Sequence, residues 1–161
     1  YSRATILEPG ILEETNRIVE RYGIAKELIE IEVTESISSI DSVSLQDIVS
    51  RFVKAGYHMA LDDFGAEYSN IYVLYSLDIH SLKLERRIVG DVYHDSRARM
   101  VVESLIGICK RLGIVCVAEG VETAEQFEAL REMGCALIQG YYLNKPLSEK
   151  DFETQYIFPQ Q

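Results

Sequence analysis

Apolar positions along the chain follow two recurring patterns, one typical of helices and one typical of buried strands. Spacings of three and four residues predict helices over 9–23, 45–55, 96–112 and 123–133, with a short helix over 68–77. Apolar runs predict strands over 28–33, 59–61, 81–84, 114–118 and 135–138. Glycines 23, 56, 113 and 134 end the four long helices. The repeated order of helix, glycine and strand predicts an α/β domain with a parallel sheet.

Every predicted strand ends in a polar residue. The carboxyl ends of parallel strands meet at one edge, and an open doubly wound sheet uses only two or three of them at its switch point. Polar residues on all five strands therefore favour a parallel β/α (TIM-like) barrel. Five strands are too few to close it, so we expect 1–161 to be a partial barrel whose N-terminal strands are missing. The strand-end residues are Glu32 or Glu35, Asp62 with Asp63, Lys83, Glu119 and Gln139.

Two adjacent carboxylates, Asp62 and Asp63, come directly after the apolar strand 59–61. Burying them is costly unless a cation lies beside them, and hard oxygen donors suit Mg²⁺ or Mn²⁺. A solvated turn capped by Asp63 is the simpler explanation for an isolated pair. Acids at the other strand ends favour the metal, and an aspartate shared between two ions could build a two-metal site. Such a site fits hydrolysis of a phosphodiester.

Lys83 and Gln139 are the remaining polar residues at the strand ends of the predicted sheet. Lys83 would orient the attacking water or meet charge that develops on phosphate, and Gln139 could bond the same water or a ligand oxygen. A Schiff base at Lys83 fits less well, because nearby acids would keep the amine protonated. Each residue also has an ordinary alternative: Glu32 on a solvated strand face, Lys83 as a strand-end lysine, and Glu122 at a helix N-terminus.

Composition narrows the function classes. A net charge of −10 without a basic cluster argues against DNA or RNA polymers as partners. The three cysteines have no C-x-x-C spacing and lie among apolar residues, which predicts reduced core thiols and a cytoplasmic protein. We find no targeting segment and no apolar run of membrane-spanning length, although segments outside this chain could tether a longer protein. The string Asp63-Phe64-Gly65 also occurs in protein kinases, but neither H-R-D nor A-P-E accompanies it, so we reject that class.

The ordered set of motifs resembles the C-terminal two-thirds of the EAL-domain family, cyclic di-GMP phosphodiesterases built on a β/α barrel. Individually the strings are modest signals, but their order and spacing agree along nearly the whole chain. They are Glu32-Val33-Thr34-Glu35-Ser36, Asp62-Asp63-Phe64-Gly65 with Tyr68-Ser69, Lys83, Ala118-Glu119-Gly120-Val121-Glu122-Thr123, and Gln139-Gly140-Tyr141 with Lys145-Pro146.

The resemblance implies roles for these residues. Glu32, Asp62 and Glu119 would ligate a first Mg²⁺ or Mn²⁺, and Asp63 would help to hold a second. Lys83 and Gln139 would position the water and the scissile phosphate, Glu35 would steady the loop after Asp63, and Glu122 would support the site from behind. The implied reaction is hydrolysis of cyclic di-GMP to linear pGpG in bacterial second-messenger signalling. A homodimer and an upstream diguanylate-cyclase-type or sensor domain are the implied partners.

Several departures from the family pattern leave alternatives open. The Glu-Ala-Leu segment and a metal-binding asparagine would both lie before Tyr1, so we expect this chain alone to hydrolyse slowly or not at all. Ala66-Glu67 replaces the usual Thr-Gly, and Lys83-Leu84-Glu85 replaces Lys-Ile-Asp. A degenerate EAL module that senses cyclic di-GMP or binds a protein without cleaving is the second hypothesis. An unrelated metal-dependent barrel lyase is the third.

Overall fold

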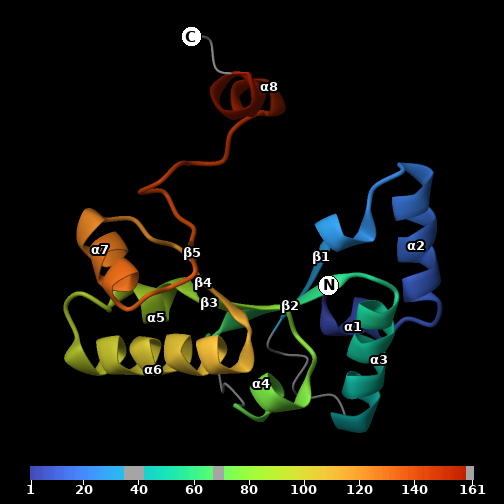
Figure 1. The fold of residues 1–161 in the computed structure, drawn as a ribbon, viewed down its shortest axis with the longest axis horizontal. Coiled ribbons are helices and arrows are strands. Elements are labelled where there is room, and N and C mark those ends of the chain that lie inside the picture. Colours follow the sequence, from blue (N-terminus) through green and yellow to red (C-terminus); the bar gives the residue numbers. More distant parts are fainter. Residues whose placement is uncertain (35–41, 67–70, 159–161) are drawn as a thin grey trace.

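A computed structural model describes residues 1–34, 42–66 and 71–158 of the chain (Figure 1). Helices and strands alternate along most of it. The helices are α1 (Arg3–Ile6), α2 (Ile11–Arg21), α3 (Ser42–Lys54), α4 (Tyr72–Ser76), α5 (Arg86–Gly90), α6 (Ser96–Leu112), α7 (Ala124–Glu132) and α8 (Glu149–Phe152), with a 3₁₀ turn over Lys26–Leu28 and a π-helical turn over Glu153–Ile157. The strands are β1 (Glu30–Thr34), β2 (His58–Phe64), β3 (Ser81–Leu84), β4 (Val115–Ala118) and β5 (Leu137–Ile138).

All five strands form one parallel sheet in the order β1-β2-β3-β4-β5. An unbroken order with right-handed crossovers sets each connecting helix on the same face, whereas a doubly wound sheet reverses its order at a switch point. In the view of Figure 1 the strands lie at the centre, with α2 and α3 at the right along the β1 and β2 end of the sheet and α6 and α7 at the left along the β4 and β5 end. The predicted β/α class, with five strands of a TIM-like barrel, is confirmed by this topology and by the similar structures reported below.

The two faces of the sheet differ in polarity. One face is buried beneath the helices, because alternate residues of each strand are apolar and point the same way. The opposite face carries acids and a lysine that remain partly open to solvent. The buried face includes Ile31, Val33, Met59, Leu61, Leu82, Leu84, Cys116 and Ala118, which pack with Val49 and Phe52 of α3 and with Val102 and Ile106 of α6.

Several predicted boundaries differ in the structure. The strand predicted over 59–61 is the longer β2, which includes Asp62 and Asp63, and the strand predicted over 135–138 is only Leu137–Ile138. The strand predicted over 28–33 begins at Glu30, because Lys26–Leu28 forms a 3₁₀ turn that leaves Leu28 78% exposed. The helix predicted over 68–77 is described only as Tyr72–Ser76, since 67–70 lie outside the described residues. A capping box opens α7: the Thr123 side chain accepts from the Gln126 N–H, and the Gln126 amide oxygen accepts from the Thr123 N–H.

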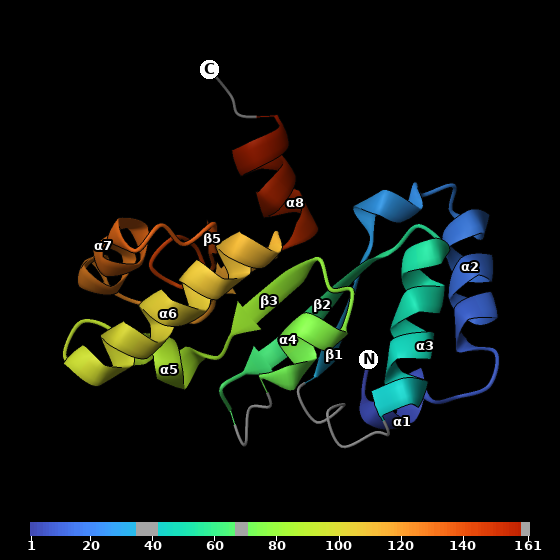
Figure 2. The same ribbon diagram turned by 60° about the horizontal axis from the view of Figure 1, so that its bottom comes forward.

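The C-terminal segment extends beyond the sheet. Figure 1 shows α8 standing away from the other helices, and in Figure 2 it projects upward beyond them; Phe152, Tyr156 and Phe158 in this segment are exposed. Cys109 and Cys116 are buried free thiols, and Cys135 is a partly buried one, which agrees with reduced thiols packed against the core. Within the described part of the chain, we find no helix whose length and apolar content would allow it to cross a bilayer.

Candidate metal centre

A β-bulge in β2 brings both aspartates to the same face of the sheet. Ordinarily, adjacent strand residues point to opposite faces. Here Leu61 pairs with Leu82 and Phe64 pairs with Leu84, so Asp62 and Asp63 together lie opposite the single residue Lys83. A bulge of this kind re-aims side chains, and bulges are common beside active sites. The extra residue also returns Phe64 to the core face, where it is 3% exposed.

Asp63 makes the bulge with an unusual backbone conformation. Its φ angle is 57°, and it is the non-glycine residue with positive φ within 1–34, 42–66 and 71–158. Aspartate tolerates this left-handed region better than most residues, and such conformations gather at functional sites. The Asp63 N–H donates to Asp62 Oδ1 at 3.0 Å. Burial, together with repulsion from Asp62 and Glu85, raises the pKa of the Asp63 carboxyl.

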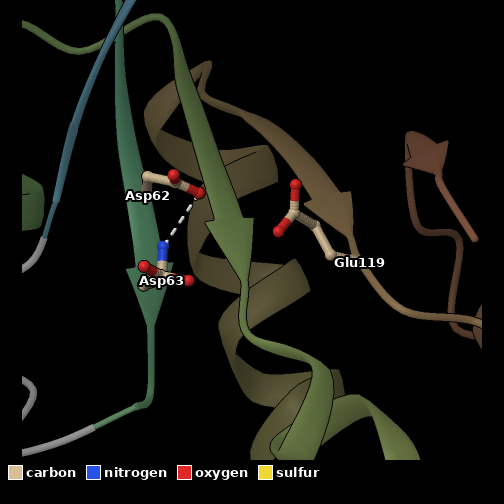
Figure 3. Close-up of side chains that lie close together, drawn as sticks. All are labelled: Asp62, Asp63 and Glu119. Carbon is tan, nitrogen blue, oxygen red and sulfur yellow. Dashed lines mark hydrogen bonds between the residues drawn. The ribbon is translucent and has the colours of Figure 1, made fainter. Parts of the chain in front are cut away.

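The carboxylate of Glu119 closes the cluster from the end of β4. Figure 3 shows the Asp62 and Glu119 carboxylates facing each other from strands on either side of β3. One potential ligand atom from each of Asp62, Asp63 and Glu119 lies within 4.8 Å of the others. The three carboxylates therefore offer hard oxygen donors at one point, and this donor set fits Mg²⁺ or Mn²⁺.

Lys83 lies among the acids, and its side chain is only 12% exposed. Its ammonium group lies 2.7 Å from Glu32 Oε1, 2.9 Å from Glu119 Oε1 and 3.2 Å from Asp62 Oδ1. Burial by itself would lower the pKa of Lys83, but the bonds to Glu32 and Glu119 and the charge of Asp62 outweigh it and raise the pKa above the ordinary lysine value. The amine is therefore a fixed positive charge at neutral pH, which argues against a Schiff-base nucleophile.

The structure describes Glu32 but not Glu35, so only the prediction for Glu32 can be compared with it. Glu32 belongs to β1 and reaches the cluster through its 2.7 Å bond to Lys83. Its carboxylate is not among the three that lie within 4.8 Å of one another in the described part of the chain. Glu35, predicted to steady the loop after Asp63, lies outside the described residues.

Glu122 is placed beside the cluster by contacts around Gly120. Its carboxylate lies 2.7 Å from the guanidinium of Arg86. Gly120 has a φ of 67°, and an added Cβ there would lie 2.4 Å from Cγ of Arg86. The Arg86 stem therefore packs directly against the backbone that follows Glu119, and Glu122 holds the guanidinium at its end.

Gln139 follows β5 and is fixed mainly through its backbone. Its N–H donates to the Ala118 carbonyl at 2.8 Å, and its carbonyl accepts from the Val121 N–H at 3.1 Å. The next residue must be glycine, because a Cβ on Gly140 would lie 2.0 Å from the Val121 carbonyl oxygen. The exposed Gln139 side chain lines a hollow of about 360 Å³ together with residues 140–141, 144–147, 152 and 156.

The family to which the chain belongs is decided by a comparison of sequences. The EAL domain model matches residues 1–146. The chain belongs to the EAL domain family. An EAL relative, the cyclic di-GMP phosphodiesterase PA2567 of Pseudomonas aeruginosa, is 33% identical over 152 residues. That match includes 94% of this chain but 26% of the relative, so the chain spans about a quarter of its length.

Solved EAL structures are similar along nearly the whole chain. The EAL domain of Mycobacterium smegmatis DcpA superposes with a TM-score of 0.92 at 27% identity, covering 100% of this chain and 72% of that one. The manganese and cyclic di-GMP complex of Klebsiella pneumoniae BlrP1 has a TM-score of 0.79 at 29% identity, covering 84% of this chain and 35% of that one. These similarities agree with the EAL resemblance drawn from the sequence motifs.

Two features of this EAL site, the bulge and the ion pairs of the two arginines at the start of α5, were not predicted from the sequence. The bulge could have been suspected from Phe64, an apolar residue that would share a face with Asp62 under strict alternation. The ion pairs of Arg86 and Arg87 with Glu122 and Glu85 carry no comparable signal, because neighbouring charged residues are ordinary on a helix surface.

Proposed function

We propose that this chain carries part of a metal-dependent phosphodiesterase site for cyclic di-GMP, which it would convert to linear pGpG. The observation that carries the proposal is the convergence of Asp62, Asp63 and Glu119 within 4.8 Å beside the partly buried ammonium group of Lys83. A relative named as a cyclic di-GMP phosphodiesterase and a similar structure holding manganese with cyclic di-GMP support the choice of substrate.

Each residue would contribute through its position. Asp62, Asp63 and Glu119 would hold one or two divalent cations, which when bound activate water and neutralise the phosphate. The bulge aims both aspartates inward, so neither needs to leave its place in the strand. Lys83 brings a permanent positive charge to the same face, where it can attract a phosphate or meet charge that develops on it. Gln139 would contact the ligand or its water from β5.

Metal binding is the first test of this proposal. We expect the 161-residue chain to bind Mn²⁺ in isothermal titration calorimetry and to lose at least about tenfold in affinity on Asp62→Asn. The matched control is Asp47→Asn, which changes an exposed aspartate on α3. Equal Mn²⁺ affinity in all three proteins would show that the carboxylate cluster is not the metal site.

Hydrolysis is the second test. A protein that carries these residues within a complete barrel is expected to form pGpG from cyclic di-GMP with Mg²⁺ or Mn²⁺, and to lose activity on Asp63→Asn. Binding of cyclic di-GMP with no pGpG formed would instead establish the non-catalytic sensor. The Ala66-Glu67 sequence that follows the bulge favours that second candidate, because it replaces the family's usual Thr-Gly, with loss of a glycine and gain of an acidic residue.

A further inference from the structure

The turn that follows the bulge is held from outside the sheet. Asp63 has a φ of 57° and Gly65 a φ of 103°, so two residues within three adopt left-handed conformations. The Ala66 N–H donates to the Asp63 carbonyl at 3.1 Å and closes the turn. A left-handed conformation costs most residues other than glycine about 1–2 kcal/mol, and aspartate bears part of that cost. The turn therefore needs contacts elsewhere to keep Asp63 in place.

Arg87 of α5 supplies such a contact. Its Nη2 donates to the Ala66 carbonyl at 2.8 Å, and its Nε lies 3.2 Å from Oε2 of Glu85. Glu85 is itself fixed at both ends: its carboxylate accepts from the Arg87 N–H at 2.9 Å, and its own N–H donates to the Phe64 carbonyl at 3.1 Å. The chain from Phe64 to Ala66 is thus tied at two points to the junction of β3 and α5.

We propose that Arg87 is a positioning residue for the metal centre, because its guanidinium clamps the Ala66 carbonyl to Glu85 and so holds the Asp63 turn. This inference rests on the proposed function only for its effect on metal binding. The planar guanidinium is needed, since it must reach a carbonyl and a carboxylate at the same time. A lysine at this position would donate from one nitrogen instead of the two nitrogens, Nε and Nη2, that bond Glu85 and Ala66 here, so its ammonium would have to lie near both acceptors.

The charges around the clamp agree with this role. Glu85 places a negative charge close enough to the carboxylate of Asp63 to repel it. Arg87 places a positive charge directly on Glu85 and so offsets that repulsion. The neighbouring Arg86 differs, because it points to Glu122 and packs over Gly120 on the other side of the site.

The experiment measures two quantities separately: the hydrogen exchange of the turn and the affinity for Mn²⁺. It compares the 161-residue wild-type chain with Arg87→Ala, Arg87→Lys and a control, Arg99→Ala. Arg99 is a suitable control because it belongs to α6 and pairs with Glu132, 3.1 Å away. We expect the Ala66 amide to exchange its hydrogen faster in both Arg87 variants. We also expect their Mn²⁺ affinity to fall about tenfold, and millimolar methylguanidinium to restore part of it in Arg87→Ala. Arg99→Ala should match the wild type in both measurements.

Each remaining outcome decides against one claim. Unchanged Ala66 exchange in Arg87→Ala would overturn the clamp. Faster exchange with unchanged Mn²⁺ affinity would show that Arg87 holds the turn without positioning Asp63, and would overturn the proposal. If the wild type does not bind Mn²⁺, the proposed metal function fails, and the inferred role of Arg87 in the metal centre fails with it; the exchange data then report on the turn alone.

Discussion

Replacing Lys83 with methionine should destabilise the fold by removing the cation that three acids share. Methionine keeps most of the side-chain volume, so the main loss is the ammonium bonded to Glu32, Asp62 and Glu119 at 2.7, 3.2 and 2.9 Å. Removing one partner from a buried ion pair typically costs about 3–5 kcal/mol. The acids are 45%, 20% and 20% exposed, so solvent screens part of the repulsion, and we expect a loss of about 2–3 kcal/mol.

Urea unfolding measures this loss. With an m-value of about 2 kcal/mol per molar, the midpoint in EDTA should fall by about 1 M relative to the wild type. The control is Lys54→Met, at an exposed position of α3, which should change the midpoint little. Millimolar Mn²⁺ should restore more stability to Lys83→Met than it adds to the wild type, because the cation then replaces the missing charge among the acids.

The pH dependence has a defined sign. The pKa of Lys83 is raised above the ordinary 10.5, so its stabilising charge is fully present below that value and is lost as the pH rises through the raised pKa. The stability difference between wild type and Lys83→Met should therefore persist to pH 10 and shrink only above it. Equal urea midpoints in EDTA at pH 7 and low salt would refute the reasoning, because three unshielded carboxylates would then cost nothing.

Two further substitutions test the bulge and the turn after β5. Asp63→Asn should raise the free energy of unfolding by up to about 1 kcal/mol at pH 7, because asparagine tolerates positive φ and removes the carboxylate whose burial and repulsion by neighbouring acids raise the Asp63 pKa. A raised carboxyl pKa costs stability only once the group ionises, so this gain should vanish near pH 3. An equal gain at pH 3 and pH 7 would contradict this explanation. Gly140→Ala should lose at least about 2 kcal/mol in chemical denaturation, because its Cβ would meet the Val121 carbonyl oxygen at 2.0 Å. Gly107→Ala is the matched control within α6, where nothing lies within 4 Å and helix propensity predicts a small gain; losses of equal size at both glycines would argue against the close approach.

The repeating pattern of the chain was enough to predict the class of fold. Helices ending in glycine and apolar strands ending in acids specify a parallel sheet, because periodicity and helix capping are local properties of the sequence. The same pattern placed Asp62, Lys83 and Glu119 at one edge, since the carboxyl ends of parallel strands lie together. Strand boundaries were less accurate: the turn at Lys26–Leu28 reads like the start of an alternating strand.

Only the tertiary structure decided how the acids are arranged around Lys83. Strict alternation would send Asp62 and Asp63 to opposite faces, and the bulge that unites them depends on pairing with β3, which is distant in sequence. The sharing of Lys83 among acids of three strands likewise requires the register of the sheet. The sequence by itself determined which residues could bind a cation; the pairing between strands decided that Asp62, Asp63 and Glu119 meet within 4.8 Å, because distances between strands are set by long-range contacts.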